Sequence, residues 1–451
     1  MQLIREREKK MAPVQKSHAT FFYNLAYAVF AVAYLPVFLK KIKQESRPGQ
    51  LWRERLGFLP PPEKSQCATV WIHAVSVGEV MAIQKFVVEL LTRCQELDVV
   101  LTTVTPTGQK IARQMQQERL RVFYFPFDFS FACRRFFRTL RPQCLLLAET
   151  EIWPNLLIQA RQFGVPVGIL NARLSRKSAG RYRALGFLFK DFFRHLDFVL
   201  AQTAEDAARF INCGLPSERV SVLGNMKFDN VVLNERESEK STLAALKKEW
   251  GIGTEDRIWI AGSTHPGEEE MITRVFSRVR LQHPQLRLIF APRHVERAPG
   301  LVRQLSASGL RIGLVANRHS EKWDVLVLDQ MGILKNLYQI ADVVFMGGSW
   351  IRHGGQNPIE PAGFKKPVLH GPYVFNFEKI YQILDQEGGS IQVEHETELA
   401  ETLEMLLKDE PRREALGQKA FFLVKQLQGA TERYLDWVLH FFAISPVLRQ
   451  Y

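Results

Sequence analysis

Cysteine is scarce in this 451-residue sequence, which holds only five, none of them in a Cys-x-x-Cys pair. An odd, scattered set excludes a disulfide framework, and no histidines cluster at zinc-ligand spacing, so a structural metal is not indicated. A reducing compartment is the simplest interpretation. Global disorder is excluded as well, since 46% of the residues are hydrophobic and only 24% are charged.

Acidic residues are also in deficit, because 47 Asp and Glu face 60 Lys and Arg, for a net charge of +13. The excess lies in the first half: residues 1–50 sum to +6, residues 51–230 to +8 and residues 231–451 to −1. This asymmetry predicts that the N-terminal half meets a polyanion, either a nucleic acid or an anionic membrane surface. The C-terminal half is expected to handle a smaller ligand.

Residues 21–39 form an uncharged stretch that approaches the length of a membrane-spanning helix. Basic residues flank it on both sides, but three tyrosines and Asn24 make it less apolar than most spanning helices. A helix lying in the membrane interface and a buried core helix are the alternatives. No small-residue cleavage site follows, which argues against a removed signal peptide. We expect a membrane anchor, and therefore a lipid surface rather than nucleic acid, with the bulk of the chain in the cytoplasm.

Short apolar runs alternate with longer amphipathic stretches from residue 69 onward, as in a parallel sheet covered by helices. The pattern occurs in two blocks. The first block predicts strands at residues 69–75, 98–104, 121–125, 144–149, 166–172, 198–202 and 219–224. The second block predicts strands at residues 258–263, 286–292, 311–316, 324–329, 342–348 and 367–371.

The two blocks predict an α/β protein with two doubly wound, Rossmann-like domains that face each other across a cleft. Residues 1–45 would be a basic tail with the membrane anchor, residues 46–230 the first domain and residues 231–250 a polar linker containing a helix. Residues 251–451 would be the second domain, ended by a closing helix at about 410–445.

Side chains that directly follow the strands are the candidate site residues, because ligands of open α/β sheets bind beyond the carboxyl ends of the strands. The first predicted strand runs into Ser76-Val77-Gly78-Glu79. Ser-x-x-Glu is the pattern of a capping box, in which the two side chains satisfy backbone N–H groups. Gly78 favours a ligand instead, because glycine in a helical turn costs about 1 kcal/mol relative to alanine. A close approach of ligand to backbone would explain it.

Two carboxylates, Glu149 and Glu151, follow the strand at 144–149 within an otherwise basic domain. They could raise each other's pKa and serve acid–base chemistry or hold a cation, or each could pair with a nearby arginine. Cations crowd the next strand-to-helix turn, either as a solvated helix face or as a site for phosphate groups. These cations are Arg173, Arg176, Lys177, Arg181 and Arg183, and Lys227 lies at a further strand end.

The second block lacks the common nucleotide motifs, since its glycine-rich turns match neither G-x-G-x-x-G nor Walker A. The turn at 263–270 either receives a phosphate on its free amides or is a helix cap whose three glutamates complement the helix dipole. Pro292 and Arg293 follow another strand, and a glycine-rich turn at 354–360 enters a helix. Glu360 at the start of that helix could accept two ribose hydroxyls.

Seven runs, in order, resemble the bacterial Kdo transferases: HAVSVGEV (73–80), AETEIWPN (148–155), NARLSRKS (171–178), GNMKFD (224–229), GSTHPGEE (262–269), APRHVER (291–297) and GGQNPIEPA (354–362). That family consists of membrane-associated GT-B glycosyltransferases that transfer 3-deoxy-D-manno-oct-2-ulosonic acid (Kdo) from CMP-Kdo to a lipid A precursor, lipid IVA. The resemblance covers nearly the whole chain. It implies an acceptor-binding domain at 46–230, a CMP-Kdo-binding domain at 251–451, a role in lipopolysaccharide biosynthesis and a place on the cytoplasmic face of the bacterial inner membrane.

The resemblance also implies roles for individual residues. Glu79 would be the general base, and Glu149 and Lys227 would stabilise the transition state. Ser263 is a weaker candidate for the donor site. The CMP pocket would be formed by Pro292, Arg293, Met331, Gly332, Ile333, Asn357, Pro358, Ile359 and Glu360, with the ribose on Glu360.

One departure from the family pattern is Ile333, which stands where the family usually has a glutamate after Met-Gly. A carboxylate contact there is lost, whereas backbone contacts could survive. The implied chemistry is an inverting single displacement that needs no cofactor, and a donor with one phosphate needs no metal. Two rival interpretations remain: a GT-B enzyme that uses a UDP-sugar and a lipid-linked acceptor, and a non-catalytic anionic-lipid-binding protein.

Overall fold

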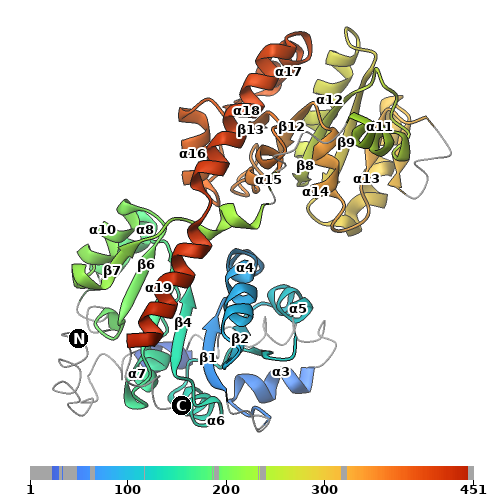
Figure 1. The fold of residues 1–451 in the computed structure, drawn as a ribbon. Helices are drawn as coiled ribbons and strands as arrows, with labels where there is room; N and C mark the ends of the chain where they lie inside the picture. The colour runs from blue at the N-terminus through green and yellow to red at the C-terminus, as the bar shows by residue number, and fades with distance from the viewer. Residues whose placement is uncertain are drawn as a thin grey trace. The chain divides into compact units, whose positions relative to one another are not determined.

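The computed structural model describes residues 23–29, 33, 48–60, 67–115, 117–184, 186, 192–231, 233, 240–315 and 322–444. The chain divides into two compact units (Figure 1). Unit 1 contains Met1–Asn230 together with Gln428–Tyr451, and unit 2 contains Val231–Leu427. Each unit has its own parallel sheet, so the prediction of two doubly wound α/β domains is confirmed.

The sheet of unit 1 has seven parallel strands in the order β3-β2-β1-β4-β5-β6-β7. The strands are β1 (Ala68–His73), β2 (Leu97–Thr103), β3 (Leu120–Tyr124), β4 (Cys144–Ala148), β5 (Val167–Ala172), β6 (Phe198–Ala201) and β7 (Val220–Val222). Each overlaps a predicted apolar run, because strands buried on both faces read as nearly continuous hydrophobic segments. The strand order reverses between β1 and β4, which is where an open sheet forms its ligand crevice.

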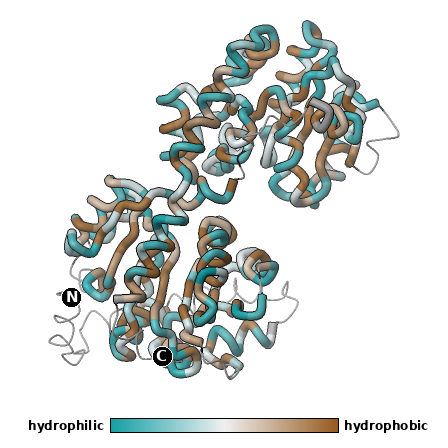
Figure 2. Tube along the Cα trace, viewed as in Figure 1, coloured by the Kyte–Doolittle hydropathy of each residue, from teal (hydrophilic) through white to brown (hydrophobic). Residues whose placement is uncertain are grey.

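Helices cover both faces of this sheet. Apolar side chains of α6 (Ser130–Leu140), α7 (Pro154–Gln162) and α10 (Ala204–Asn212) pack on one face, and those of α4 (Val77–Arg93), α5 (Pro106–Gln114) and α19 (Ala430–Ile444) pack on the other. The unit also contains α3 (Pro48–Arg55), α8 (Arg176–Ala184), η1 (Ser217–Arg219) and η2 (Met226–Asn230). Figure 2 shows strands that are hydrophobic along their length and helices with hydrophilic and hydrophobic sides.

The sheet of unit 2 also has seven parallel strands, in the order β10-β11-β9-β8-β12-β13-β14, and its order reverses between β8 and β12. The strands are β8 (Arg257–Thr264), β9 (Leu286–Pro292), β10 (Ile312–Leu314), β11 (Val325–Val327), β12 (Val343–Met346), β13 (Val368–His370) and β14 (Ser390–Gln392). The helices include α11 (Lys240–Glu249), α12 (Glu268–Arg280), α13 (Ala298–Leu305), α14 (Leu334–Leu337), α15 (Ile359–Gly363), α16 (Glu378–Gln386), α17 (Glu396–Lys408) and α18 (Glu410–Leu427). Only β14 was not predicted, because a three-residue strand with a single apolar residue gives no hydrophobic run.

The C-terminal helix differs from the prediction, which placed residues 251–451 in one domain and drew a single closing helix at 410–445. The helix breaks at Gly429, whose φ is +85°, and the chain then returns to unit 1 as α19. Buried Tyr434 and Val438 of α19 join the apolar cluster of unit 1, and the Tyr434 hydroxyl donates to the carbonyls of Leu200 (3.0 Å) and Gly224 (3.1 Å). The apolar face of α19 thus completes the core of the other domain.

Asp229 fixes the start of α19. Its buried carboxylate accepts hydrogen bonds from the backbone N–H groups of Gly429 (2.6 Å) and Thr431. The side chain therefore does for α19 what an N-cap residue does, although it lies 200 residues earlier in the chain. The run GNMKFD, which contains Asp229, thus has a structural role in addition to carrying Lys227.

Most of the predicted anchor at 21–39 lies outside the described residues, but residues 23–29 are helical. Tyr23 donates to the buried carboxylate of Asp128 (2.7 Å), whose backbone N–H donates to the hydroxyl of Tyr27 (3.1 Å). Asn155 donates its side-chain amide to Asn24 (2.7 Å). The polar residues that are unusual for a spanning helix therefore bind polar groups of unit 1. Among the described helices, none is long and apolar enough to cross a membrane.

Candidate active site

Glu79 lies in the first turn of α4, at the carboxyl end of β1, and its side chain is turned back toward the strand. Its carboxylate accepts hydrogen bonds from the Val75 N–H (2.7 Å) and from the Ser76 hydroxyl (3.0 Å). Ser76 makes no capping bond to the helix, so the reciprocal pattern of a capping box is not formed. These two bonds hold the Glu79 carboxylate in one orientation, and the carboxylate does not cap the helix.

The protonation of Glu79 is tuned by its surroundings. Burial raises its pKa to about 7, and the negative charge of Glu149 adds to the rise. The bonds from Val75 and Ser76 and the positive charge of Lys227 oppose it. A carboxyl with a pKa near 7 can take up or release a proton at neutral pH, which is what a general base requires.

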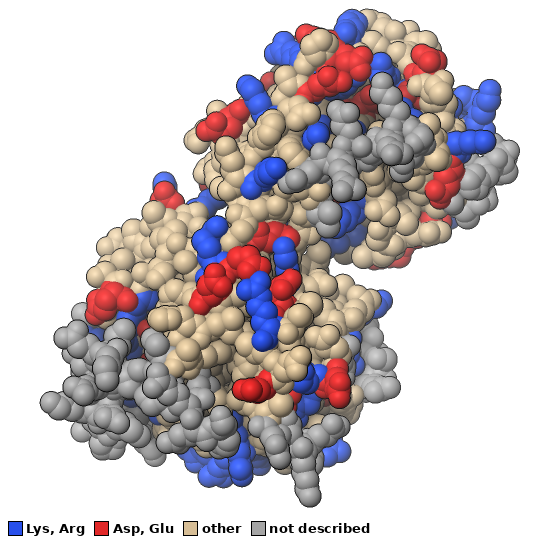
Figure 3. Space-filling model, viewed as in Figure 1, with Lys and Arg blue, Asp and Glu red and all other residues tan. Residues whose placement is uncertain are grey.

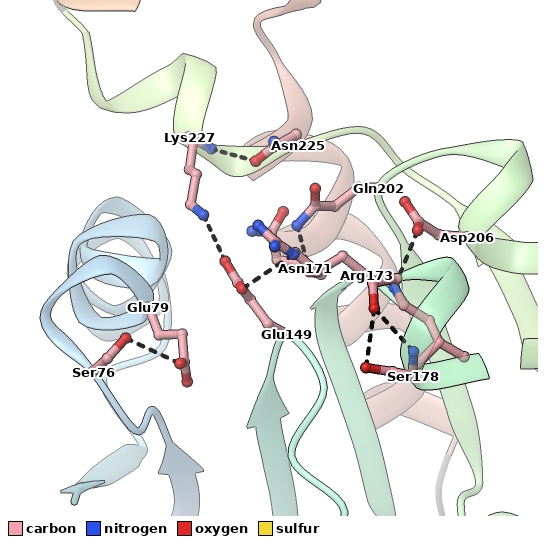
Figure 4. A network of polar contacts seen from close by, with 12 residues as sticks. Ser76, Glu79, Glu149, Asn171, Arg173, Ser178, Gln202, Asp206, Asn225 and Lys227 are labelled. Carbon is pink, nitrogen blue, oxygen red and sulfur yellow. Dashed lines mark hydrogen bonds and ion pairs between the residues drawn. The ribbon is translucent and has the colours of Figure 1, made fainter. Parts of the chain in front are cut away.

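Glu149 directly follows β4 and has a left-handed backbone with φ +56°, a conformation that costs a non-glycine residue of order 1–2 kcal/mol. Its carboxylate pairs with the Lys227 Nζ at 2.7 Å, and Arg173 approaches it to 3.8 Å. The Glu149 and Lys227 side chains are only 15% and 17% exposed. Figure 4 shows Glu149 between Glu79 and Lys227, so the structure brings the three predicted catalytic residues together.

Asn171 positions Lys227, a role that the sequence did not reveal. This fully buried residue is the last but one of β5 and has φ +50°, and its side-chain oxygen accepts the N–H of Met226 (3.0 Å) at the start of η2. Gln202 donates to the Asn171 carbonyl (2.8 Å), and Asn225 accepts the N–H of Lys227 (3.0 Å) (Figure 4). The place of Asn171 at a strand end, in a quoted motif, was the signal available from the sequence.

Glu151 has a different environment from Glu149. It accepts a hydrogen bond from the Trp153 indole (2.9 Å), and burial, followed by the charge of Glu79, raises its pKa to about 8. The two alternatives for this acidic pair therefore both occur: Glu149 binds cations, whereas Glu151 is a buried carboxyl whose pKa is raised. In the predicted cation cluster, Arg173 approaches Glu149. The four basic residues of α8 are exposed, namely Arg176, Lys177, Arg181 and Arg183.

The predicted CMP-binding residues lie at the carboxyl edge of the sheet of unit 2. Pro292 ends β9, and the N–H of Arg293 donates to the carbonyl of Thr264 at the end of β8 (2.9 Å). Asn357 accepts the N–H of Ile359 (3.2 Å) at the start of α15. Pro358 and Ile359 of this turn are buried.

Glu360 and the segment 331–333 belong to the same edge. Burial raises the pKa of Glu360, while the positive charges of Lys335 and Arg293 oppose the rise, so these groups from three elements lie within electrostatic reach. Met331 is 69% exposed, Gly332 has φ +88° and Ile333 is the N-cap residue directly before α14. The backbone of this turn is therefore accessible to a ligand even though residue 333 lacks a carboxylate.

The three glutamates after β8 do not act alike. Glu268 is buried, and its carboxylate accepts the N–H of His265 (3.1 Å) and two N–H groups of the loop after β12, those of Gly348 (2.6 Å) and Trp350 (3.0 Å). Glu268 thus joins two loops, which neither the phosphate-binding nor the helix-cap alternative predicts.

Ser263 has a left-handed backbone, φ +56°, in the same turn. In the described part of the chain, no three metal-ligating side chains form a metal site.

Two doubly wound units with site residues at their sheet edges define a two-domain α/β protein of the GT-B type. Solved structures share this fold. A UDP-GlcNAc 2-epimerase from Neisseria meningitidis has a TM-score of 0.56 at 12% identity and matches 82% of this chain and 100% of its own. A putative UDP-N-acetylglucosamine 2-epimerase from Listeria monocytogenes has a TM-score of 0.56 at 11% identity, covering 85% and 99%.

Sequence comparison identifies the family. A family model described as 3-deoxy-D-manno-octulosonic-acid transferase (kdotransferase) matches residues 50–230. The 3-deoxy-D-manno-octulosonic acid transferase of Haemophilus influenzae is 34% identical over 392 residues, 85% of this chain and 89% of that one. The transferase of Bordetella pertussis is 34% identical over 380 residues, covering 82% and 86%. The chain belongs to the Kdo transferase family and is a glycosyltransferase.

Proposed function

We propose that this protein transfers Kdo from CMP-Kdo to the lipid A precursor lipid IVA in lipopolysaccharide biosynthesis, by inversion with Glu79 as general base. Family membership supports the transfer of Kdo. The observation that carries the mechanism is the fixed orientation of Glu79, whose pKa lies near 7 beside the Glu149–Lys227 pair.

In the proposed reaction, an acceptor hydroxyl attacks the anomeric carbon of Kdo while Glu79 removes the hydroxyl proton. A carbon–oxygen bond to the acceptor forms, and the bond from the anomeric carbon to the phosphate oxygen breaks, so CMP leaves with the electron pair. One displacement inverts the configuration and requires one base. Lys227 supplies positive charge toward the negative charge that develops on the donor, and Glu149 holds the Lys227 ammonium in place.

Unit 2 would bind the donor. Arg293 follows β9 and supplies charge for the phosphate, whereas Glu360 accepts the ribose hydroxyls. Raised by burial, the pKa of Glu360 would fall once hydroxyl donors bind its carboxylate. The turn at 331–333 would contact the cytosine through backbone groups, which the Ile333 side chain leaves unchanged.

A basic and aromatic face supports binding to an anionic membrane. The exposed side of α6 carries Phe131 and basic residues, and Phe58 lies beside it under Arg135, whose guanidinium is 4.2 Å from the ring centroid. Figure 3 shows Lys and Arg gathered where unit 1 carries α6. The exposed basic residues of this face are Arg134, Arg135, Arg138 and Arg141. We call Phe58, Phe131 and these arginines the α6 face.

The helix at 23–29 extends the apolar part of this surface. Tyr27 packs edge-on against Phe129 (5.1 Å between centroids), which stacks on Phe131 (5.6 Å), while Leu25 and Val29 are exposed. Aromatic and aliphatic side chains beside arginines suit a lipid–water interface. We therefore infer that unit 1 rests on the cytoplasmic face of the inner membrane, where a lipid-linked acceptor would be presented.

The test is mass spectrometry of the products that the full chain forms from CMP-Kdo and tetraacylated lipid A precursor. We expect added Kdo with the wild-type protein and a loss of roughly 10²–10⁴-fold in rate with Glu79→Gln, while CMP binding is retained. A wild-type protein that transfers nothing would show that the donor or the acceptor is wrong. A Glu79→Gln variant with normal rate would make Glu149 the next candidate base.

Nucleotide competition in the same assay distinguishes a CMP-Kdo-dependent enzyme from the alternative, a GT-B enzyme that uses a UDP-sugar donor. CMP should inhibit transfer, whereas UDP at the same concentration should not. A non-catalytic lipid-binding protein would give no product with any nucleotide sugar and would be indifferent to Glu79→Gln.

A further inference from the structure

Three imidazoles from three loops of unit 2 meet beside the proposed CMP-binding residues. His265 follows β8, His294 follows β9, and His353 lies in the loop after β12, three neighbouring strands of the sheet. The rings of His265 and His353 are stacked with centroids 4.1 Å apart, and that of His294 stands edge-on to His265 at 6.2 Å. Stacked rings do not converge their nitrogens on one point, so this is not the geometry of a metal site.

The chain around His265 is built to hold its ring. The Gln356 amide nitrogen lies 3.2 Å from His265 Nε2, and the backbone N–H of His265 is bound by the buried Glu268 carboxylate. Gly348, with φ +69°, passes so close that an added Cβ would lie 3.2 Å from the His265 ring. Glycine is therefore needed at position 348 for the backbone and for the ring together.

Positively charged groups lie near the ring pair. Burial, together with the charges of His353, His294, Arg293 and Arg297, lowers the pKa of His265 to about 4, so the ring is neutral at pH 7. Arg297 is balanced by an ion pair with the buried Glu269 carboxylate (2.9 Å), whereas Arg293 adds positive charge that favours an anion. The buried Glu268 carboxylate is engaged by three backbone N–H groups, and Glu296 approaches His294 to 3.5 Å from the exposed side. A bound anion would relieve the electrostatic repulsion among Arg293 and the three imidazoles.

We propose that His265 and His353 bind the carboxylate of the donor sugar, beside the phosphate that Arg293 meets. The inference rests on the proposed function, because it assumes a donor made of a nucleotide and an acidic sugar. Such a donor carries two separate anions, the phosphate and the sugar carboxylate. Asn357 directly follows Gln356 in the chain, and Glu360, which would hold the ribose, lies four residues beyond it. Gln356 thus links the nucleotide-binding residues to the imidazole pair.

The experiment compares three ligands on the full chain: CMP, CMP-Kdo, and CMP-Kdo whose carboxylate is a methyl ester. For His265→Asn and His353→Asn we expect the KM for CMP-Kdo to rise about tenfold or more, since a hydrogen bond to a charged group contributes roughly 1.5–3 kcal/mol. The Kd for CMP should stay within about twofold, which also shows that unit 2 is folded. The ester should bind the wild-type protein about tenfold more weakly than CMP-Kdo, and the variants should no longer distinguish the two.

The matched control is His440→Asn, which changes an exposed histidine of α19 in unit 1. It should leave the binding of all three ligands unchanged. If His265→Asn and His353→Asn weaken CMP and CMP-Kdo equally, the rings serve the phosphate or the base, and the assignment to the carboxylate is wrong. Unchanged KM values in both variants would overturn it as well. A wild-type protein that binds neither CMP nor CMP-Kdo would instead remove the proposed function.

Discussion

Three carboxylates at the carboxyl edge of one sheet have three different environments. Glu149 is paired with Lys227 and Arg173, whereas burial raises the pKa of Glu79 to about 7 and that of Glu151 to about 8. Burial thus moves the pKa of two of these carboxyls into the range in which acid–base sites work. The sequence indicated the carboxylates, since each follows a strand. It could not assign their protonation, which depends on neighbours such as Lys227, 78 residues from Glu149.

The pH dependence of the rate tests the coupling among these residues. A general base must be deprotonated, so kcat/KM should rise with pH and level off above the pKa of Glu79, about 7. Because the charge of Glu149 raises that pKa and the charge of Lys227 lowers it, Glu149→Gln should move the acid limb to lower pH and Lys227→Met should move it to higher pH. We expect shifts of roughly 0.5–1 unit, measured from initial rates between pH 5 and 9.

Lys177→Met, which removes an exposed cation of α8, is the matched control and should leave the acid limb in place. Shifts in the same direction for Glu149→Gln and Lys227→Met would contradict Glu79 as the group that titrates.

Gly78 provides a second test at the residue scale. It is exposed in the first turn of α4, and an added Cβ would meet only the Ser76 hydroxyl, at 3.9 Å. The protein itself leaves room for alanine, so Gly78→Ala should raise the free energy of unfolding by up to about 1 kcal/mol. We nevertheless expect a higher KM for the acceptor, because the methyl group would occupy space that a ligand uses. Urea unfolding and initial rates measure the two effects.

Gly300→Ala, at an equally open position in α13, should add stability without changing the KM. A Gly78→Ala variant that is fully active would mean that nothing approaches the backbone there.

Strands and helices were predictable where the hydrophobic pattern of the segment itself identifies them. Thirteen of the fourteen described strands overlap predicted apolar runs, because buried parallel strands are hydrophobic on both faces. Membership of α19 in unit 1 was not predictable, because the apolar stripe of an amphipathic helix does not specify the sheet it covers. Its partner is fixed by Asp229 and by the Tyr434 hydroxyl, through contacts more than 200 residues apart in sequence.

The cap of α19 can be tested by hydrogen exchange. Asp229→Ala removes both acceptors of the Gly429 and Thr431 N–H groups and should destabilise the first turn of α19 by about 1–2 kcal/mol. Amide exchange there should accelerate by roughly tenfold for every 1.4 kcal/mol, if α19 opens locally. Asp436→Ala, on the exposed side of the same helix, should leave exchange unchanged. Equal protection in wild type and Asp229→Ala would show that packing alone holds the helix.

At the scale of the whole molecule, charge is distributed unevenly along the chain. The positive excess belongs to residues 1–230, whereas residues 231–451 sum to −1. A cation-rich unit beside an anionic surface gains attraction that salt screens over about 8–10 Å. The charge split was visible in the sequence, but the gathering of arginines around Phe58 and Phe131 on one face was not, since it depends on the packing of α6 against the chain before β1.

Charge reversal on the α6 face tests membrane binding. The double variant Arg138→Glu/Arg141→Glu should lower the affinity for vesicles of mixed phosphatidylglycerol and phosphatidylcholine more than tenfold, since each basic residue contributes about 1 kcal/mol at such a surface. Binding of the wild-type protein should weaken with added salt. The control Arg303→Glu/Arg412→Glu changes two exposed arginines of unit 2 and should have little effect in a sedimentation assay. Equal losses for both pairs would point to net charge rather than to this face.

The return of the chain at Gln428 governs how the protein is made. Unit 1 takes its first 230 residues from the start of the chain and its last helix from the end, with unit 2 inserted between them. On a ribosome that adds roughly 5–20 residues per second, the face of the first sheet that awaits α19 stays uncovered for on the order of 10–40 s while unit 2 is synthesised. We therefore expect nascent unit 1 to be a substrate for chaperones until translation ends. A premature stop codon just before residue 430 would yield a chain whose later half is complete while its earlier half lacks part of its core.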